Sequence, residues 1–149
     1  MENSEAKITV HPVDSDNWRD VARLSVDGEQ SQFVAAPSYY LALCCYSTWY
    51  PLAIYRKQTV IGFMMWGVDD DESCWLGGIL IDRLEQRKGY GRRAVKAAIT
   101  MLKAQTNATE FALSYQAENT VARKLYKSMG FTETGEMEDD EIVARLKLS

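Results

Sequence analysis

The stretch from Cys74 to Gln105 constrains the fold of this chain more than any other part of the sequence. It begins with the run CWLGGILI, whose apolar and β-branched content predicts a buried strand. A loop with several basic residues and two glycines follows, and an apolar periodicity typical of a helix begins directly after it. A strand, a cationic glycine loop and a helix in this order present backbone N–H groups to a phosphate.

The residues of this loop match the needs of an anion. Gly89 and Gly91 lack a Cβ atom, so the chain can turn tightly and a ligand can approach the backbone. The first N–H groups of the following helix have no partner within the helix and carry the positive end of its dipole. A basic helix start without a ligand is the alternative, but cations are disfavoured at that end of a helix. We therefore expect a pyrophosphate to bind beside the basic residues Arg87, Lys88, Arg92 and Arg93.

Two other phosphate-binding motifs fit less well. The run from Gly89 to Ala94 has the G-x-G-x-x-A form of a dinucleotide fingerprint, which requires an acidic residue at the end of the next strand. Glu110 lies near the required distance but opens its strand, and 149 residues are too few for a two-half dinucleotide fold with a substrate domain. No Lys-Ser or Lys-Thr pair follows the second glycine, so the Walker-type P-loop fails as well.

Two motifs resemble those of the GCN5-related N-acetyltransferases (GNAT). The run Gln86-Arg87-Lys88-Gly89-Tyr90-Gly91 is similar to the Q/R-x-x-G-x-G/A loop with which this family binds acetyl-CoA. The run NTVARKLYKSMGF, from Asn119 to Phe131, is similar to the family's N-x-x-A-x-x-L-Y-x-x-x-G-F signature. The order and separation of the motifs agree with the family. The resemblance covers nearly the whole chain, so we expect residues 1–149 to form a single GNAT domain.

The resemblance implies an α/β (α+β) fold. Its sheet is mixed and mostly antiparallel, with about six to seven strands, a central parallel pair splayed into a V, and about four flanking helices. Acetyl-CoA is the implied cosubstrate, and its pantetheine amides would pair with strand backbone in the gap of the V. The implied acetyl-CoA contacts are Ile79, Leu80, Ile81, Gln86, Arg87, Lys88, Gly89, Tyr90, Gly91, Arg92, Asn119 and Arg123, and no metal is expected.

Acetyl transfer to an amine requires proton transfers. A primary amine with a pKa of about 10.4 arrives protonated and must lose a proton before it attacks. By resemblance, Tyr126 is the acid that protonates the leaving thiolate, although an aromatic core residue would fit the same position. The backbone N–H of Leu80 is the implied donor to the oxyanion. Candidates for the base are Glu29, Glu72 and Glu118, and a chain of water molecules is an alternative.

Composition and charge restrict the partners. With 17 basic and 21 acidic residues the net charge is −4, which disfavours nucleic acid and acidic membranes and favours a cationic substrate. No apolar run has the length of a membrane span and the first residues do not read as a signal peptide, so we expect a cytoplasmic protein. The three cysteines lack metal-ligand spacing. We expect reduced thiols with Cys44 and Cys45 buried, and a structural role for the single histidine, His11.

Periodicity and turn residues predict the remaining elements. We expect a first helix capped by Asp14 or Ser15, and a last helix capped by Asn119 and ended by Gly130. The acidic run from Asp69 to Glu72 is interpreted as a solvated hairpin tip or as an ammonium site. The other predicted elements are a strand at Ile8–Val10, a helix at Ser38–Tyr46, strands at Pro51–Tyr55, Thr59–Trp66 and Glu110–Ser114, a helix at Thr120–Met129, and a closing strand pair from Phe131 and at Glu141–Leu148.

The acceptor is inferred from resemblance. Segments such as Gly62–Gly67 and Trp75-Leu76 are similar to bacterial spermine/spermidine (diamine) acetyltransferases, so a small-molecule amine of the polyamine type is the first expectation. Residues expected to contact it are Glu29, Phe33, Glu72 and Trp75. Those enzymes usually carry a carboxylate just after the Trp-Leu pair, where this chain has Gly77 and Gly78. A wider cleft for an amino sugar or a peptide N-terminus is the alternative, as is a CoA-binding module without catalysis. The resemblance is also compatible with a homodimer.

Overall fold

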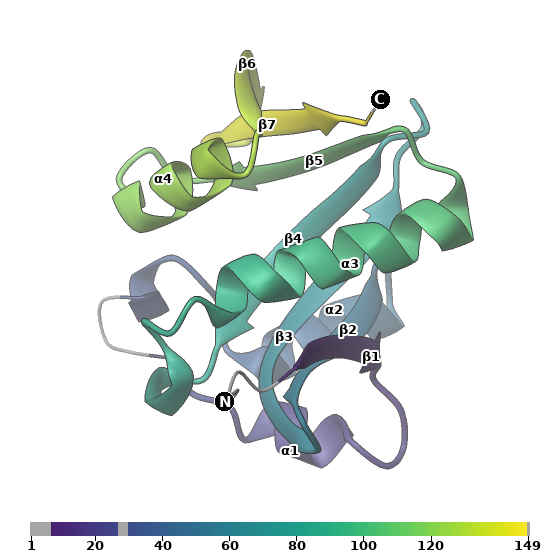
Figure 1. Cartoon of the computed structure of the whole chain (residues 1–149), viewed down its shortest axis with the longest axis vertical. Helices are drawn as coiled ribbons and strands as arrows, with labels where there is room; N and C mark the ends of the chain where they lie inside the picture. Colours follow the sequence, from purple (N-terminus) through teal and green to yellow (C-terminus); the bar gives the residue numbers. More distant parts are fainter. Residues whose placement is uncertain (1–6, 27–29, 149) are drawn as a thin grey trace.

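A computed structural model describes residues 7–26 and 30–148 of the chain. These residues form one seven-stranded sheet in the order β1-β2-β3-β4-β5-β7-β6 (Figure 1). The strands are β1 (Ile8–Pro12), β2 (Tyr50–Arg56), β3 (Thr59–Val68), β4 (Cys74–Ile81), β5 (Glu110–Tyr115), β6 (Thr132–Glu138) and β7 (Glu141–Lys147). The helices are α1 (Trp18–Ala22), α2 (Pro37–Cys45), α3 (Tyr90–Thr106) and α4 (Thr120–Ser128), with short 3-10 turns η1 (Gln30–Gln32) and η2 (Arg83–Glu85).

The central strands β4 and β5 form the sheet's single parallel pair among the described residues. All other neighbours in the sheet are antiparallel. The β4–β5 register consists of Cys74 opposite Phe111 and Trp75 opposite Ala112. Beyond these residues the two strands diverge, and Figure 1 shows the gap widening toward α4 and the start of α3. The predicted mixed sheet with a splayed parallel pair is therefore confirmed.

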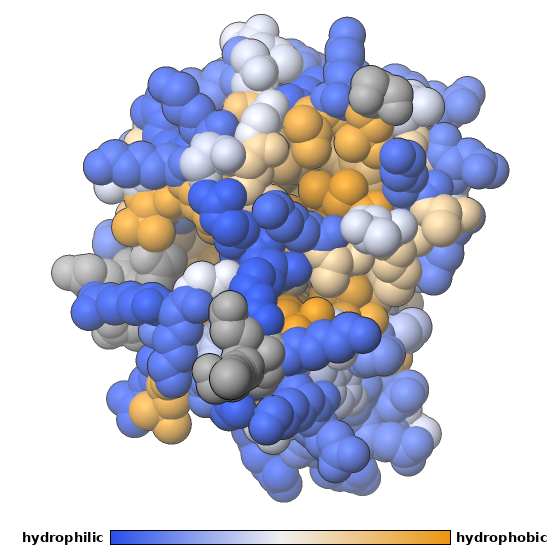
Figure 2. Space-filling view, in the orientation of Figure 1, coloured by the Kyte–Doolittle hydropathy of each residue, from blue (hydrophilic) through white to orange (hydrophobic). Residues whose placement is uncertain are grey.

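Helices cover both faces of the sheet, with α3 across one face and α1 and α2 on the other (Figure 1). Under α3, the core contains fully buried side chains such as Leu76, Phe111 and Leu102. The opposite face buries Phe63 and Val21. Burial of each such side chain contributes about 1.5–3 kcal/mol. On the α3 side the outer surface is mainly hydrophilic, and apolar groups show between α3 and β5 (Figure 2).

Strand β4 contains a β-bulge that depends on glycine. The register pairs Phe63 with Leu80 but Met65 with Gly77, so a single residue of β3 faces both Gly78 and Ile79. Gly78 has a φ of +57°, a left-handed conformation that residues with a Cβ atom disfavour. A Cβ atom there would also lie 3.3 Å from the Tyr40 ring. The bulge lies immediately before the part of β4 that borders the gap.

Two sequence-based expectations on local structure are wrong. Helix α1 begins after Asn17 and not after Asp14 or Ser15, because the Asp14 carboxylate instead closes the preceding turn by accepting the N–H groups of Asp16 and Asn17 at 2.8 and 3.1 Å. Cys45 is exposed and Cys44 is half-buried, because the short helix α2 turns only one side toward the sheet. The expected cap of α4 is confirmed, since Asn119 Oδ1 accepts the Ala122 N–H at 3.3 Å.

Candidate active site

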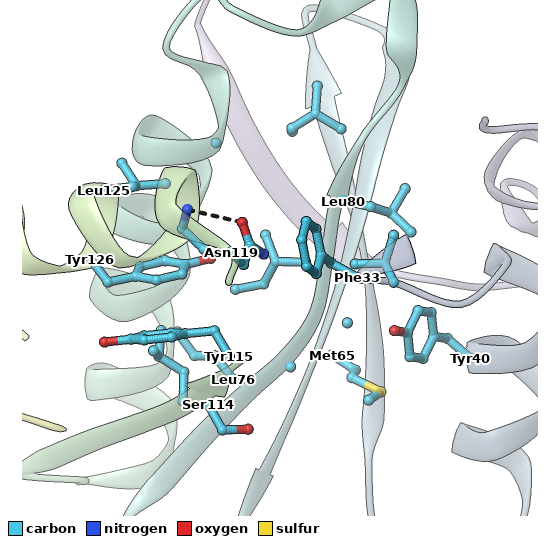
Figure 3. A pocket seen from close by; sticks show the side chains of 18 of the residues that line it. Phe33, Tyr40, Met65, Leu76, Leu80, Ser114, Tyr115, Asn119, Leu125 and Tyr126 are labelled. Carbon is cyan, nitrogen blue, oxygen red and sulfur yellow. Dashed lines mark hydrogen bonds between the residues drawn. The ribbon is translucent and has the colours of Figure 1, made fainter. Parts of the chain in front are cut away.

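The divergence of β4 and β5 opens a cavity of about 830 Å³. This volume falls within the range of about 300–1,000 Å³ that is usual for small-molecule sites. The cavity extends from the glycine loop and the start of α3, past β4, β5 and α4, to α2 and the β6–β7 hairpin. Figure 3 shows side chains from these elements pointing into it from opposite walls.

One end of the cavity is built to receive an anion. Gly89 precedes α3 with a φ of +78°, and a Cβ atom at this position would meet nothing within 4 Å. A Cβ atom on Gly91, in the first turn of α3, would meet only Ile81 Cγ1, at 3.9 Å. Arg87, Tyr90 and Arg92 line the same end. The open glycine backbone, the helix N-terminus and the two guanidinium groups fit a diphosphate.

The remaining polar side chains of the loop hold the loop itself. Gln86 lines the cavity, and its Nε2 donates to the Ile81 carbonyl at 2.9 Å, which fastens the loop to the end of β4. Lys88 Nζ lies 3.6 Å from Glu85 Oε1, outside the cavity lining. The Arg92 guanidinium donates to the Ser128 hydroxyl and so connects the start of α3 to α4.

The hydrogen-bond ladder of β4 decides which backbone groups face the gap. Asp82 N–H donates to the Ile61 carbonyl of β3 at 2.7 Å, and Ile81 pairs with Gly62. Backbone groups alternate in direction along an antiparallel pair, so Leu80 faces β3 while Ile79 and Ile81 face the gap. This is a correction to the expectation for the Leu80 N–H. Ile79 lies on the gap side because the bulge interrupts the alternation between Gly77 and Leu80.

Tyr126 lies in the opposite wall of the cavity, where its side chain is buried. Its side chain is 7% exposed, it stacks on Tyr115 at 6.0 Å between ring centroids, and its hydroxyl points from α4 toward the cavity (Figure 3). Burial, and then the neighbouring Tyr115, raise the pKa of Tyr126. The phenol is therefore fully protonated at neutral pH and can donate a proton.

The hydroxyl of Tyr115 points the other way and closes a surface network. It donates to Glu133 Oε2 at 2.8 Å, and Glu133 Oε1 accepts from Arg123 Nη2 at 2.9 Å. Arg123 also donates to the Ala117 carbonyl. Arg123 therefore forms an ion pair on the surface of α4 and does not line the cavity. The sequence analysis had instead expected this residue to contact acetyl-CoA.

The raised pKa values of the buried tyrosines predict that the stability of the folded protein falls at alkaline pH. Burial, and then the hydrogen bond to Glu133, raise the pKa of Tyr115 to about 12, from about 10 in an unfolded chain. Folding favours the neutral phenol, so this stabilisation is complete below pH about 10 and is lost as the pH rises toward about 12. Thermal unfolding followed by circular dichroism should give a constant Tm from pH 7 to 8. At higher pH the Tm should fall, first because burial raises the pKa of the Cys44 and Cys74 thiols to about 11 and then, above about pH 10, through the tyrosines. A Tm that is constant up to pH 12 would contradict this assignment.

The other end of the cavity has an aromatic wall. Trp49 lies on the two glycines of neighbouring strands, since Cβ atoms on Gly67 and Gly77 would be 3.7 and 3.4 Å from its indole ring. Phe33, Tyr40 and Trp75 also line the cavity. Gly77 and Gly78 of β4 therefore do not widen the cleft, because Trp49 fills the space beside Gly77 and Tyr40 the space beside Gly78.

Carboxylates accompany this aromatic wall, and of them only Asp69 belongs to the acidic run that the sequence offered as an ammonium site. Asp69, Glu138 and Glu141 line the cavity. Glu72 lies in the exposed turn between β3 and β4 with a φ of +69°. Glu118 is exposed and outside the cavity lining, and the position of Glu29 lies outside the described residues. No local motif marks Glu138 or Glu141, because the strand order β5-β7-β6 is what brings them to the site.

The part of the chain that the structure describes contains neither a metal-ligand cluster nor a helix that could span a membrane. In residues 7–26 and 30–148, no group of three or more His, Cys, Asp and Glu side chains is arranged to hold a metal ion. In the same part of the chain, none of the helices combines the length and the apolar character that crossing a membrane requires.

Curated relatives of the chain are acetyltransferases. The chain is 28% identical over 139 residues to the probable spermine N(1)-acetyltransferase of Bacillus subtilis subsp. natto (strain BEST195), which covers 88% of this chain and 91% of the relative. The spermine/spermidine N(1)-acetyltransferase of Bacillus subtilis (strain 168) matches with the same identity and coverage.

Solved structures share the fold at lower sequence identity. The enzyme AAC(6')-Ib in complex with paromomycin and acetyl-CoA superimposes with a TM-score of 0.80 at 14% identity, covering 95% of this chain and 93% of the other. RimL, a ribosomal L7/L12 alpha-N-protein acetyltransferase in complex with coenzyme A, gives 0.75 at 12% identity, covering 95% and 94%. The model of the acetyltransferase (GNAT) family matches residues 18–131. The chain therefore belongs to the acetyltransferase (GNAT) family, and it is an N-acetyltransferase with acetyl-CoA as its cosubstrate.

Proposed function

We propose that this enzyme transfers the acetyl group of acetyl-CoA to a primary amine of a polyamine such as spermidine or spermine. The observation that carries the proposal is the polarity of the cavity. Arg87 and Arg92 line one end, and Asp69, Glu138 and Glu141 line the other. A cationic end suits a diphosphate, and an acidic end with aromatic rings suits an ammonium group. The names of the curated relatives support the same acceptor.

Acetyl-CoA supplies the acetyl group as a thioester. Arg87, Arg92 and the first N–H groups of α3 would bind the diphosphate. The backbone of Ile79 and Ile81, which faces the gap, would pair with the pantetheine amides and donate an N–H to the thioester oxygen. Asn119 lines the same wall and fixes the start of α4.

Tyr126 would supply the proton that the leaving group needs. The ammonium of the acceptor first gives one proton to water, and the neutral nitrogen then forms the C–N bond while the C–S bond breaks. Tyr126 donates its proton to the sulfur and regains one from the nitrogen of the new amide. The raised pKa of Tyr126 means that the phenol carries its proton at neutral pH.

A panel of acceptors tests the proposal through thiol release from acetyl-CoA. Spermidine and spermine should give a kcat/KM about 10- to 100-fold above that of n-butylamine, because each additional ammonium can form a charge-assisted hydrogen bond. Kanamycin and a short peptide represent the amino-sugar and peptide acceptors, and we expect lower values for both, since Trp49 and Tyr40 limit the width of the cavity.

Mass spectrometry of the product would show which nitrogen is acetylated. A preference for kanamycin or the peptide over both polyamines would overturn the proposed acceptor. Tight binding of CoA without turnover of any amine would instead favour a CoA-binding module.

A further inference from the structure

The acidic end of the cavity receives its charge from two segments outside β4. Strand β4 contributes only apolar side chains and glycines, from Trp75 to Ile81, to the lining. The carboxylates come from the end of β3, through Asp69, and from the β6–β7 hairpin, through Glu138 and Glu141. Of these three, Glu141 is partly buried and the other two are exposed. Glu141 is therefore the carboxylate whose position the fold defines best.

A hydrogen bond from the neighbouring strand holds the Glu141 side chain. Ser114 Oγ of β5 donates to Glu141 Oε1 at 2.7 Å, and Ser114 also lines the cavity. Within the described residues, Glu141 Oε2 has no hydrogen-bond partner and no Lys or Arg forms an ion pair with this carboxylate. The group is thus fixed in one orientation with an oxygen left for a ligand.

Other carboxylates close to β7 do form ion pairs. Arg145, on the same strand β7, binds Glu110 at 2.6 Å, Glu136 at 2.7 Å and Asp71 at 3.4 Å. These three carboxylates lie outside the cavity lining and share the one guanidinium. Glu141 faces the cavity and keeps its negative charge, which attracts a cation into it.

Tyr40, from α2, lines the same cavity as Glu141. Its ring stacks on Phe63 at 5.8 Å, and its oxygen accepts the Ala35 N–H at 3.0 Å, so both the ring and the hydroxyl are fixed. Burial raises the pKa of Tyr40, the hydrogen bond from Ala35 opposes this shift, and the charge of Glu141 adds to it. Figure 3 shows the hydroxyls of Ser114 and Tyr40 both directed into the space between the walls.

We propose that Glu141, held by Ser114 and sharing its cavity with the ring of Tyr40, binds the second, non-reacting ammonium of a di- or polyamine acceptor. This inference rests on the proposed function and assigns its specificity for charge to one residue. The carboxylate supplies a charge-assisted hydrogen bond, and the tyrosine ring supplies a cation–π contact. A monoamine has no group for this position, so Glu141 selects acceptors with two separated charges.

The test is the Glu141→Gln variant, which keeps the shape of the side chain and its bond to Ser114. We expect KM for spermidine to rise about 10- to 100-fold, the loss of one charge-assisted hydrogen bond. The kcat for spermidine and both constants for n-butylamine should stay within about twofold, because the anchor does not touch the reacting nitrogen. Glu141→Asp should recover part of the affinity, and thermal unfolding shows that each variant is folded.

Asp140→Asn is the matched control, since it removes the same charge one residue away at an exposed position. An unchanged KM for spermidine in Glu141→Gln, or an equal fall in kcat for spermidine and n-butylamine, would overturn the inference. Calorimetric titration of spermidine into the CoA-loaded enzyme tests the binding role of Glu141 independently of catalysis, so a failure of this inference can be distinguished from a failure of the proposed function. A parent that binds spermidine about 10- to 100-fold more tightly than Glu141→Gln, yet acetylates no amine, would support the anchor and refute the acetylation of polyamines.

Discussion

Replacing Tyr126 with Phe should lower kcat for acetyl transfer by about 100- to 1,000-fold, which is within the usual contribution of one general acid. The benzene ring keeps its stacking on Tyr115 and its edge contact with Phe131, so the cavity keeps its shape. What is lost is the proton that the leaving sulfur requires. Pre-steady-state thiol release with spermidine measures the rate of acetyl transfer, and calorimetric titration of CoA measures the affinity for the cofactor separately.

Tyr115→Phe is the matched control for this variant. Tyr115 stacks on Tyr126, but its hydroxyl donates to Glu133 on the outer side of the wall. It should transfer acetyl groups at about the parental rate, within about threefold, because no reacting atom lies on that side. CoA affinity should be the same in both variants and the parent. If Tyr126→Phe were as fast as the parent near neutral pH, the assignment of the acid would be wrong.

Replacing Gly91 with Ala should make the protein more stable and a weaker binder of acetyl-CoA. In the first turn of α3 the added Cβ atom meets only Ile81 Cγ1, at 3.9 Å, and Ala exceeds Gly in helix propensity by up to about 1 kcal/mol. The same atom covers backbone N–H groups that a diphosphate must reach. We expect the Kd for acetyl-CoA to rise about 30- to 100-fold, equivalent to one charge-assisted hydrogen bond or slightly more.

Thr100→Ala is the matched control on the same helix. Thr100 is exposed and lies outside the cavity lining, so the substitution raises helix propensity without touching the ligand. Chemical denaturation should show comparable stabilisation for both variants, while calorimetry shows weaker binding for Gly91→Ala alone. A Gly91→Ala protein with parental affinity would mean that the diphosphate does not lie on this turn.

The sequence was most informative where one short segment determines its own structure. Gly89 and Gly91 follow an apolar strand and lie at the start of a periodic helix, and that local order predicts the turn and the anion site. Asn119 caps α4 as expected, because capping depends on residues three positions apart. The splayed pair of strands was expected from the family resemblance and not from any local pattern.

The acceptor end depends on contacts between distant segments, and there the sequence was less informative. The bulge at Gly78 arises from the register between two strands, so the wrong backbone group of β4 was expected to face the ligand. Trp49 reaches Gly77 across the sheet, and Glu141 reaches the cavity because β7 pairs with β5. Spacing along the chain does not encode any of these neighbours.

The brief pairing of β4 with β5 has a consequence for the folded protein as a whole. The chain completes its central ladder for only two residue pairs, and the inner edges beyond them offer backbone groups that water must satisfy when no ligand is bound. A molecule with amides along its length can take the place of a missing strand there. Binding of acetyl-CoA in this gap is therefore expected to stabilise the folded protein, because a ligand that binds only the folded state shifts the folding equilibrium toward it.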